Sequence, residues 1–201
     1  MDISNYKNVT IINHPLLTHK INKLRSKDTR TNEFRQIVRE ISMLEGYEAL
    51  RDIETVEREI ETPIEKTKVR FVTGKNLCIV PILRAGLGMS DGMLDLVPSA
   101  SCGHIGMYRD EVTHLPVEYF CKLPQKIAEK QVVLVDPMLA TGGSAIGAVN
   151  QLKKHGAKNI MFICIIAAPE GVKAFCEAFP DVPLFIGALD RELNENAYIC
   201  P

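Results

Sequence analysis

The sequence predicts an α/β fold with a mainly parallel sheet flanked by helices on both faces. Short aliphatic runs alternate with amphipathic helical patterns over the later two-thirds of the chain, as in βαβ proteins. The runs at residues 77–83 and 160–167 are almost wholly apolar, which is typical of strands buried on both faces. The 201 residues, of which 46% are hydrophobic, suffice for a single domain over residues 1–201 with a large core.

A helical segment and an extended arm are expected ahead of the sheet. Residues 9–12 predict a short strand before a turn at residues 13–15. Apolar residues recur at helical spacing over residues 32–50, which predicts a helix with one buried stripe. The charged segment 54–62, which a proline follows, predicts an extended edge strand or arm.

The rest of the chain predicts strands and helices in alternation. The expected strands cover residues 77–83, 103–108, 117–123, 132–135, 160–167 and 184–188. The expected helices cover residues 89–96, 145–155 and 170–179. Ligands of parallel sheets bind beyond the carboxyl ends of the strands. Four charged residues follow such predicted ends and can converge on one crevice: Arg84, Arg109, Asp136 and Asp190.

One strand-to-helix junction combines an acid with a glycine loop. Residues 132–149 read VVLVDPMLATGGSAIGAV, which is a buried strand, Asp136, a loop of small residues and a helix start. Glycines let a backbone approach an anion closely, and the free N–H groups of a helix start attract its charge. Thr141 and Ser144 add hydroxyl donors. Asp136 would repel a phosphate and is better suited to accept hydrogen bonds from sugar hydroxyls, so the junction predicts a site for a ribose phosphate.

An ordinary βα turn is the structural alternative for this loop, with Ser144 as the helix cap. The P-loop pattern does not fit, because Gly143 is followed by Ser144 and Ala145 where that pattern needs Lys. A dinucleotide fingerprint does not fit either, because it needs three spaced glycines at the turn and this loop has only an adjacent pair.

A second strand-to-glycine loop reads PILRAGLG over residues 81–88. Arg84 stands at the strand end among apolar residues, where an arginine is costly to bury without an anion, and its planar fork suits a diphosphate. The structural alternative is an ion pair between Arg84 and Asp91. A loose dinucleotide pattern, GxGxxxG, leaves a dehydrogenase as a distant alternative, and its glycines are Gly86, Gly88 and Gly92.

Composition excludes several classes of function. With 24 basic and 25 acidic residues and no basic block, the chain lacks a surface that neutralises nucleic-acid phosphates. The six cysteines form no Cys-x-x-Cys pair, so no zinc site is expected, and their apolar surroundings indicate reduced residues of a cytoplasmic protein. The N-terminus has no signal-peptide pattern, and no apolar run reaches the roughly 18 residues that span a bilayer.

The run from Asp136 to Ser144 resembles the phosphoribosyl-diphosphate (PRPP) loop of type I phosphoribosyltransferases. The uracil phosphoribosyltransferase family matches best, because Pro137 stands where many relatives carry a second acid. The resemblance covers nearly the whole chain, from Asn13 to Ile199. It implies that PRPP is bound by Arg84, Arg109, Asp136, Pro137, Met138, Leu139, Ala140, Thr141, Gly142, Gly143 and Ser144. The implied catalytic residues among these are Arg84, Arg109 and Asp136.

The same resemblance implies further features of the site. A cis peptide is expected near Arg84–Ala85. Arg109 matches a PRPP-binding arginine on a mobile hood, although composition alone would place the polar stretch 108–116 in a solvated loop. Tyr198 and Ile199 match the approach to the uracil pocket, where the family holds the base through backbone groups. The family pattern continues as Gly-Leu-Gly-Asp-Ala-Gly-Asp, so this C-terminal segment with its further uracil contacts is expected to be absent here.

The implied activity is transfer of the phosphoribosyl group of PRPP to uracil, which gives UMP and pyrophosphate in pyrimidine salvage. The implied cofactor is Mg²⁺, carried mainly by PRPP oxygens and water, with no metal ligands from the protein. A homodimer or higher homo-oligomer is also implied, and GTP activates some relatives. The alternative function is a PRPP- or nucleotide-binding regulator on the same fold with little catalysis.

Overall fold

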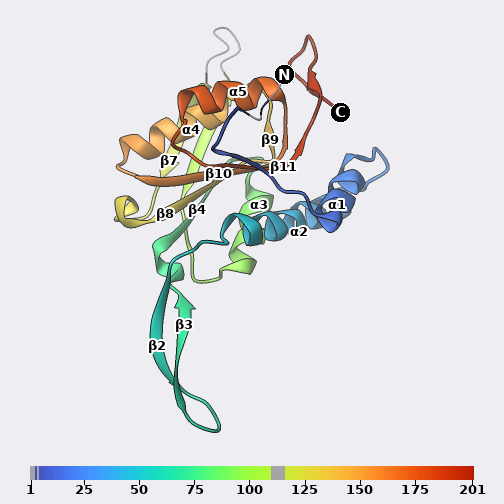
Figure 1. The fold of residues 1–201 in the computed structure, drawn as a ribbon. Helices are drawn as coiled ribbons and strands as arrows, with labels where there is room; N and C mark the ends of the chain where they lie inside the picture. Colours follow the sequence, from blue (N-terminus) through green and yellow to red (C-terminus); the bar gives the residue numbers. More distant parts are fainter. Residues whose placement is uncertain (1–2, 4, 110–115) are drawn as a thin grey trace.

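A nine-stranded sheet forms the centre of the chain (Figure 1). The computed structural model describes residues 3, 5–109 and 116–201, without the side chains of Lys75, Arg109 and Pro116. The main path of the sheet runs in the order β1 (Val9–Ile11), β11 (Leu184–Leu189), β10 (Asn159–Ala167), β8 (Gln131–Val135), β4 (Leu77–Leu83), β6 (His104–Arg109) and β7 (Pro116–Lys122).

Neighbouring strands on this path are parallel, except that β7 is antiparallel to β6. Two short strands lie off the path: β5 (Ser101–Cys102) pairs with β4, and β9 (Met138–Leu139) pairs with β10. The predicted mainly parallel sheet is therefore confirmed.

Helices cover both faces of the sheet, as predicted. Figure 1 shows α1 (Pro15–Arg25), α2 (Thr31–Ala49) and α3 (Leu87–Leu96) below the sheet. It shows α4 (Gly143–Lys154) and α5 (Pro169–Ala178) above it. Successive residues of a strand point to opposite faces, so β8 contributes Val133 to the lower core and Leu134 to the upper one. No helix of the described part of the chain is both long and apolar enough to cross a membrane.

The first helix, α1, was not expected from the sequence. Its N-cap is His14, whose Nδ1 accepts a hydrogen bond from the Leu16 N–H at 3.2 Å, and Pro15 occupies its first turn. Only Leu17 and Ile21 of this helix are buried, so its apolar stripe is too narrow to stand out as a period. The predicted turn at residues 13–15 is the start of this helix.

An antiparallel hairpin projects away from the sheet and its helices (Figure 1). It consists of β2 (Thr55–Glu61) and β3 (Lys66–Val72). The expected arm is therefore confirmed, but its second strand was not predicted, although Lys66, Lys68 and Arg70 alternate with Thr67, Val69 and Phe71 as in a strand. The 3-10 turns η1 (Gly74–Asn76) and η2 (Ile127–Glu129) lead into β4 and β8.

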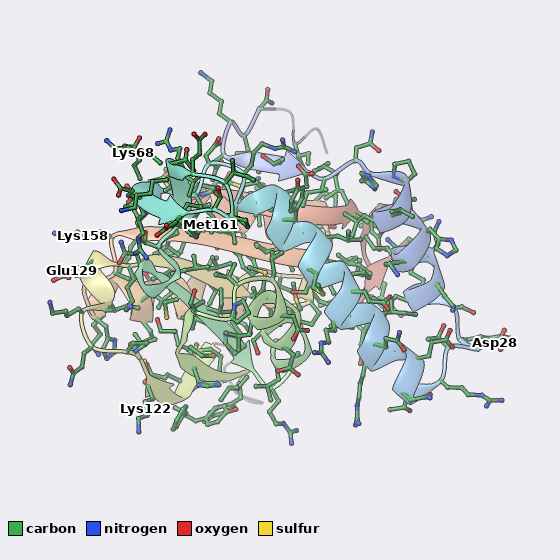
Figure 2. All side chains as sticks on the ribbon, turned by 90° about the horizontal axis from the view of Figure 1, so that it is seen from below. Asp28, Lys68, Lys122, Glu129, Lys158 and Met161 are labelled. Atoms are coloured by element: carbon green, nitrogen blue, oxygen red, sulfur yellow. The ribbon has the colours of Figure 1, made fainter. Side chains whose placement is uncertain are left out.

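The strand order creates a switch point between β4 and β8. The chain leaves β4 through α3 toward β6 on one side, and leaves β8 through α4 toward β10 on the other. Figure 2 shows Glu129 and Lys158, which precede β8 and β10, near one edge, and Asp28 on the far side of the molecule. Ligands of open α/β sheets bind at the carboxyl ends of the strands beside such a switch point.

Candidate active site

The loops that follow β4 and β8 touch each other at this switch point. Pro81 of β4 pairs with Val135, the last residue of β8. A Cβ atom added to Gly86 would lie 2.5 Å from the Val135 carbonyl oxygen, so the two backbones meet where only glycine fits. Arg84 and Asp136 therefore follow adjacent strands, at the same edge of the sheet.

The loop after β8, residues 136–142, is the segment predicted to bind a phosphate and is called the phosphate loop below. It ends at the start of α4, which no side chain caps. Gly142 is the N-cap of α4, with φ +88°, and no side chain caps it. The Ile146 N–H donates to the Gly142 carbonyl at 2.9 Å, whereas the first N–H groups of any helix have no intrahelical acceptor. Ser144 lies inside the helix, so its predicted alternative role as the cap is wrong. These N–H groups and the helix dipole are available to an anion.

Neighbouring elements hold this loop in place. The Ile166 and Ala168 N–H groups donate to the Pro137 and Leu139 carbonyls at 3.0 and 2.9 Å. A Cβ atom on Gly171, in the first turn of α5, would lie 2.3 Å from the Ala140 carbonyl oxygen. Sequence reasoning missed this supporting role of Gly171, because the contact joins segments about 30 residues apart and leaves no local pattern.

Asp136 carries a strongly perturbed carboxyl group. Its side chain is half-buried and, within the described part of the chain, has no hydrogen bond or ion pair. Desolvation by burial raises the pKa of Asp136 from 3.8 to about 7. Its backbone N–H donates to the Ile163 carbonyl at 3.3 Å, which anchors the residue to β10. The carboxyl oxygens are therefore free to accept hydrogen bonds from neutral donors such as sugar hydroxyls.

Arg84 is exposed rather than buried, so an anion can reach it from solvent. The peptide between Leu83 and Arg84 is cis, one residue before the expected position. Among the residues that the structure describes, no ion pair joins Arg84 to Asp91, so the structural alternative for this arginine is not supported.

The loose glycine pattern after β4 is a packing feature. A Cβ atom on Gly92 would lie 2.3 Å from the Arg39 carbonyl oxygen, and one on Gly88 would lie 3.1 Å from Val38 Cγ1. Both neighbours belong to α2, so these two glycines let α3 pack closely against α2. The dinucleotide interpretation, and the dehydrogenase with it, is therefore not supported.

Arg109 ends β6, which neighbours β4 on the side away from β8. Its backbone therefore lies beside the crevice, one strand from Arg84. Its side chain, and residues 110–115 of the predicted hood in the stretch 108–116, lie outside the described residues. The predicted contact of Arg109 with PRPP stays a prediction.

Residues 190–201, called the tail below, contain a small hairpin of β12 (Glu192–Leu193) and β13 (Ile199–Cys200). Asp190 follows β11, as predicted, but its carboxylate is held by a bidentate ion pair with Arg25. It is therefore not a ligand-binding acid of the crevice. Tyr198 is 71% exposed, and no hydrogen bond between described residues joins Tyr198 or Ile199 to the phosphate loop.

Asp136 is a candidate oxygen donor to a metal ion beside the anion loop. Within residues 3, 5–109 and 116–201, no group of three or more His, Cys, Asp or Glu side chains could hold a metal ion. Asp136 supplies one carboxylate beside the anion loop. This arrangement fits Mg²⁺, which keeps several waters and takes most of its other ligands from phosphates.

Several solved structures share this architecture, and phosphoribosyltransferases are among them. A purine phosphoribosyltransferase from Pyrococcus horikoshii superposes with a TM-score of 0.53 at 19% identity, covering 77% of this chain and 83% of that chain. A structure of a protein from Aquifex aeolicus superposes with a TM-score of 0.91 at 38% identity, covering 95% of this chain and 91% of that chain. The chain therefore has the fold of type I phosphoribosyltransferases.

Sequence comparison identifies the family. A family model described as uracil phosphoribosyltransferase matches residues 11–201. A uracil phosphoribosyltransferase of Streptococcus pneumoniae is 61% identical over 193 residues, which cover 96% of this chain and 92% of the relative. One of Clostridium novyi is 58% identical over 193 residues with the same coverage. The chain belongs to the uracil phosphoribosyltransferase family.

Proposed function

We propose that the protein transfers the phosphoribosyl group of PRPP to uracil and releases UMP and pyrophosphate, a reaction of pyrimidine salvage. The observation that carries the proposal is the contact between two loops at the switch point. One presents an acid and a free helix start, and the other presents an exposed arginine. A sugar with a phosphate at one end and a diphosphate at the other matches these three features.

Each part of PRPP has a partner in this arrangement. The 5′-phosphate binds the N–H groups at the start of α4, within residues 140–144. Asp136 accepts hydrogen bonds from the ribose hydroxyls. Arg84 and Arg109 bind the diphosphate, for which the guanidinium fork is well suited. The remaining loop residues, Pro137, Met138 and Leu139, carry the backbone between the sugar and the phosphate.

Catalysis follows from positioning and charge. The bond between the anomeric carbon and the diphosphate oxygen breaks, and its electron pair leaves with pyrophosphate. The sugar becomes oxocarbenium-like, and the uracil ring nitrogen forms the new bond from the opposite face as its proton is lost to solvent. Arg84 and Arg109 stabilise the charge on the leaving group without a protein nucleophile. Mg²⁺ bound to the diphosphate supplies further neutralisation of that charge.

We assign the binding of uracil to the tail hairpin. Tyr198 offers an exposed aromatic face, and Ile199 offers backbone groups for the polar edge of uracil. Both belong to the hairpin that begins at Asp190, directly after β11. This assignment derives from the family resemblance together with the position of the hairpin at the carboxyl end of the sheet.

Self-association is proposed through the arm. Ile64 at its tip is 90% exposed, and Phe71 and Val72 on its second strand are also exposed. A projecting hairpin with apolar side chains is a suitable contact for a second copy of the chain, in a homodimer or higher oligomer. Activation by GTP and a cytoplasmic location follow from the resemblance and stay predictions.

The test is a steady-state assay of the purified protein with PRPP, Mg²⁺ and one nucleobase at a time. We expect UMP and pyrophosphate in equal amounts from uracil, and no nucleotide from adenine or hypoxanthine. Saturable PRPP binding without UMP formation would instead support the alternative function, a regulator on the same fold.

A further inference from the structure

The ion pair between Arg25 and Asp190 joins the last residue of α1 to the root of the tail hairpin. Arg25 Nη1 donates to Asp190 Oδ2 at 2.8 Å, and Nη2 donates to the other carboxylate oxygen. The side chains are 23% and 7% exposed, which makes this the most enclosed ion pair among the described residues. A bidentate pair fixes orientation as well as distance.

Arg25 also borders the beginning of the phosphate loop. Its side chain lines a cavity of about 430 Å³ between α1, α2 and the loops after β4 and β8. The other lining residues include Leu24, Phe34, Ala85, Pro137, Met138 and Ile166. One arginine therefore contacts the root of the tail and lines the same cavity as Pro137 and Met138, which follow Asp136.

The tail has few other attachments to the body. The Asp190 N–H donates to the Ala167 carbonyl at 2.8 Å, and the Leu193 N–H donates to Glu170 Oε1 at 3.1 Å. The Arg191 N–H donates to the Cys200 carbonyl at 3.0 Å, which closes the hairpin on itself. Among the described residues whose side chains anchor the tail, Arg25 comes from the helical layer below the sheet and Glu170 from α5 above it.

We infer that Arg25 is a positioning residue for the base. It sets the hairpin that carries Tyr198 and Ile199 at a fixed place relative to the phosphate loop, by holding Asp190 on one side and bordering Pro137 and Met138 on the other. The inference rests on the proposed function, in which that hairpin binds uracil. Loss of the ion pair lets the tail hairpin with its base site move. The phosphate loop keeps its position, because it is anchored separately on β10 and α5.

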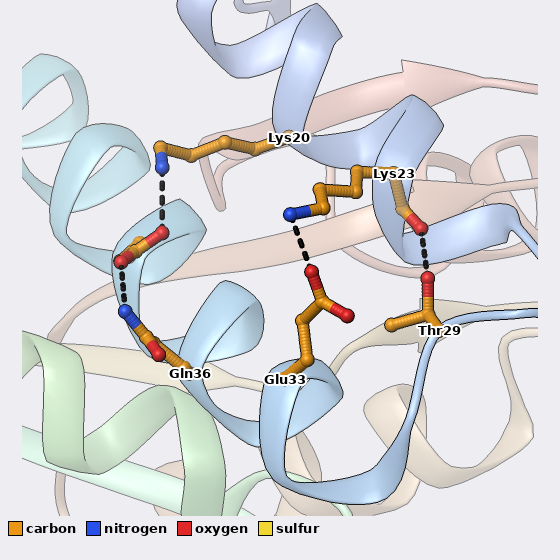
Figure 3. A network of polar contacts seen from close by, with 6 residues as sticks. Lys20, Lys23, Thr29, Glu33 and Gln36 are labelled. Carbon is orange, nitrogen blue, oxygen red and sulfur yellow. Dashed lines mark hydrogen bonds and ion pairs between the residues drawn. The ribbon is translucent and has the colours of Figure 1, made fainter.

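The test compares Michaelis constants for the two substrates in matched variants. In Arg25→Met the KM for uracil is expected to rise at least tenfold, while the KM for PRPP changes less than twofold. Arg25→Lys, which keeps the charge and loses the fork, is expected to fall between wild type and Arg25→Met. The control is Lys20→Met, on the same helix as Arg25, α1; Figure 3 shows Lys20 there. This variant breaks the 2.5 Å ion pair of Lys20 with Glu40 of α2. It is expected to leave both KM values within twofold.

The inference is overturned if the KM for uracil is unchanged in Arg25→Met, or if both KM values rise in parallel with a fall in the melting temperature. If Arg25→Met does not fold, Arg25→Lys and the isosteric Asp190→Asn decide between these results. Failure of the proposed function is recognised separately, because wild type then forms no UMP. If wild type is active and Tyr198→Ala raises the KM for uracil while Arg25 variants do not, only the role of Arg25 is refuted.

Discussion

Gly86 lies so close to Val135 that a Cβ atom would approach the Val135 carbonyl oxygen to 2.5 Å. The same atom would lie 2.9 Å from the Ile82 nitrogen, so no side-chain motion can relieve the clash. This contact locks the arginine loop after β4 onto the last residue before Asp136. The two halves of the proposed PRPP site therefore share one rigid junction.

Gly86→Ala should separate these two halves. We expect the KM for PRPP to rise roughly tenfold, because Arg84 and Asp136 no longer share one geometry, and ~1 Å misplacements have large effects on catalysis. Gly92→Ala is the matched control, since its Cβ would lie 2.3 Å from the Arg39 carbonyl oxygen, away from the crevice. If Gly86→Ala and Gly92→Ala lower the melting temperature equally and also raise the KM for PRPP equally, the junction at Gly86 does not position Arg84 and Asp136.

Arg84→Gln should slow the chemical step. Loss of a preorganised group that stabilises the leaving charge costs about 10²- to 10³-fold in kcat. The measurement is the initial rate of UMP formation at saturating substrates. Arg39→Gln removes an exposed arginine that pairs with Asp95 on the helical face, and its kcat is expected to stay at the wild-type value. An unchanged kcat in Arg84→Gln would refute the assignment.

The affinity for PRPP should depend on the ionisation of Asp136. Burial raises its pKa to about 7, and sugar hydroxyls donate to the ionised form, so binding favours loss of the proton. As the pH falls below 7, affinity should fall by nearly tenfold per pH unit. Calorimetric titration from pH 5.5 to 8.5 measures this slope. Asp136→Asn is the control, because in this variant residue 136 does not titrate and the PRPP phosphates still do. If PRPP affinity changes with pH equally in wild type and in Asp136→Asn, Asp136 does not bind the sugar hydroxyls.

Glu45 should make the free energy of unfolding depend on pH. It is wholly buried on α2, its two carboxyl oxygens have no hydrogen-bond partner among the described residues, and burial raises its pKa well above 4.5. Below pH 4.5 the group is neutral whether the chain is folded or unfolded. Above that value the unfolded state ionises first, so stability falls with rising pH by up to about 1.4 kcal/mol per unit until the folded pKa is reached.

Glu45→Gln removes this ionisation. In urea unfolding, its stability relative to wild type should be greater at pH 8 than at pH 5. Glu40→Gln on the same helix is the control: hydrogen bonds from Lys20 and Gln36 lower the pKa of Glu40 below 4.5, so Glu40 is ionised in both the folded and the unfolded state, and the relative stability of this variant should change little between pH 5 and pH 8. Relative stabilities of Glu45→Gln that do not change with pH would show that Glu45 is partnered in solution.

Tyr198→Ala should weaken the binding of uracil specifically. Stacking of a base on an aromatic side chain contributes about 1–3 kcal/mol, so the KM for uracil should rise about tenfold or more. The KM for PRPP should stay constant. Tyr47, which is 66% exposed on α2, provides a control as Tyr47→Ala. If uracil binds Tyr198→Ala as tightly as wild type, the base does not stack on this residue.

The buried strands of the sheet could be predicted because each is a nearly continuous apolar run. Residues 132–135 and 160–167 are examples, and both form strands within a residue of the expected bounds. The helix α1 was missed because only Leu17 and Ile21 are buried. The tail hairpin was missed because its strands have two residues each, too short for any period.

The candidate site was visible in the sequence where its residues are contiguous. Asp136 to Ser144 form one segment, and the expected strand, loop and helix start are all present there. The contacts that support the site were not predictable, because they join distant parts of the chain. Gly171 packs against Ala140 of this segment, and Arg25 pairs with Asp190 at the root of the tail. Likewise Asp190 was expected in the crevice, and only the structure places Arg25 against it.

A crystal structure of the protein with bound UMP would show whether the two loops form one nucleotide site. We expect the phosphate oxygens to accept hydrogen bonds from the N–H groups at the start of α4, within residues 140–144. We also expect the ribose hydroxyls to donate to Asp136 and the base to contact the tail hairpin. A nucleotide whose phosphate lies away from the start of α4, or whose ribose does not reach Asp136, would contradict this expectation.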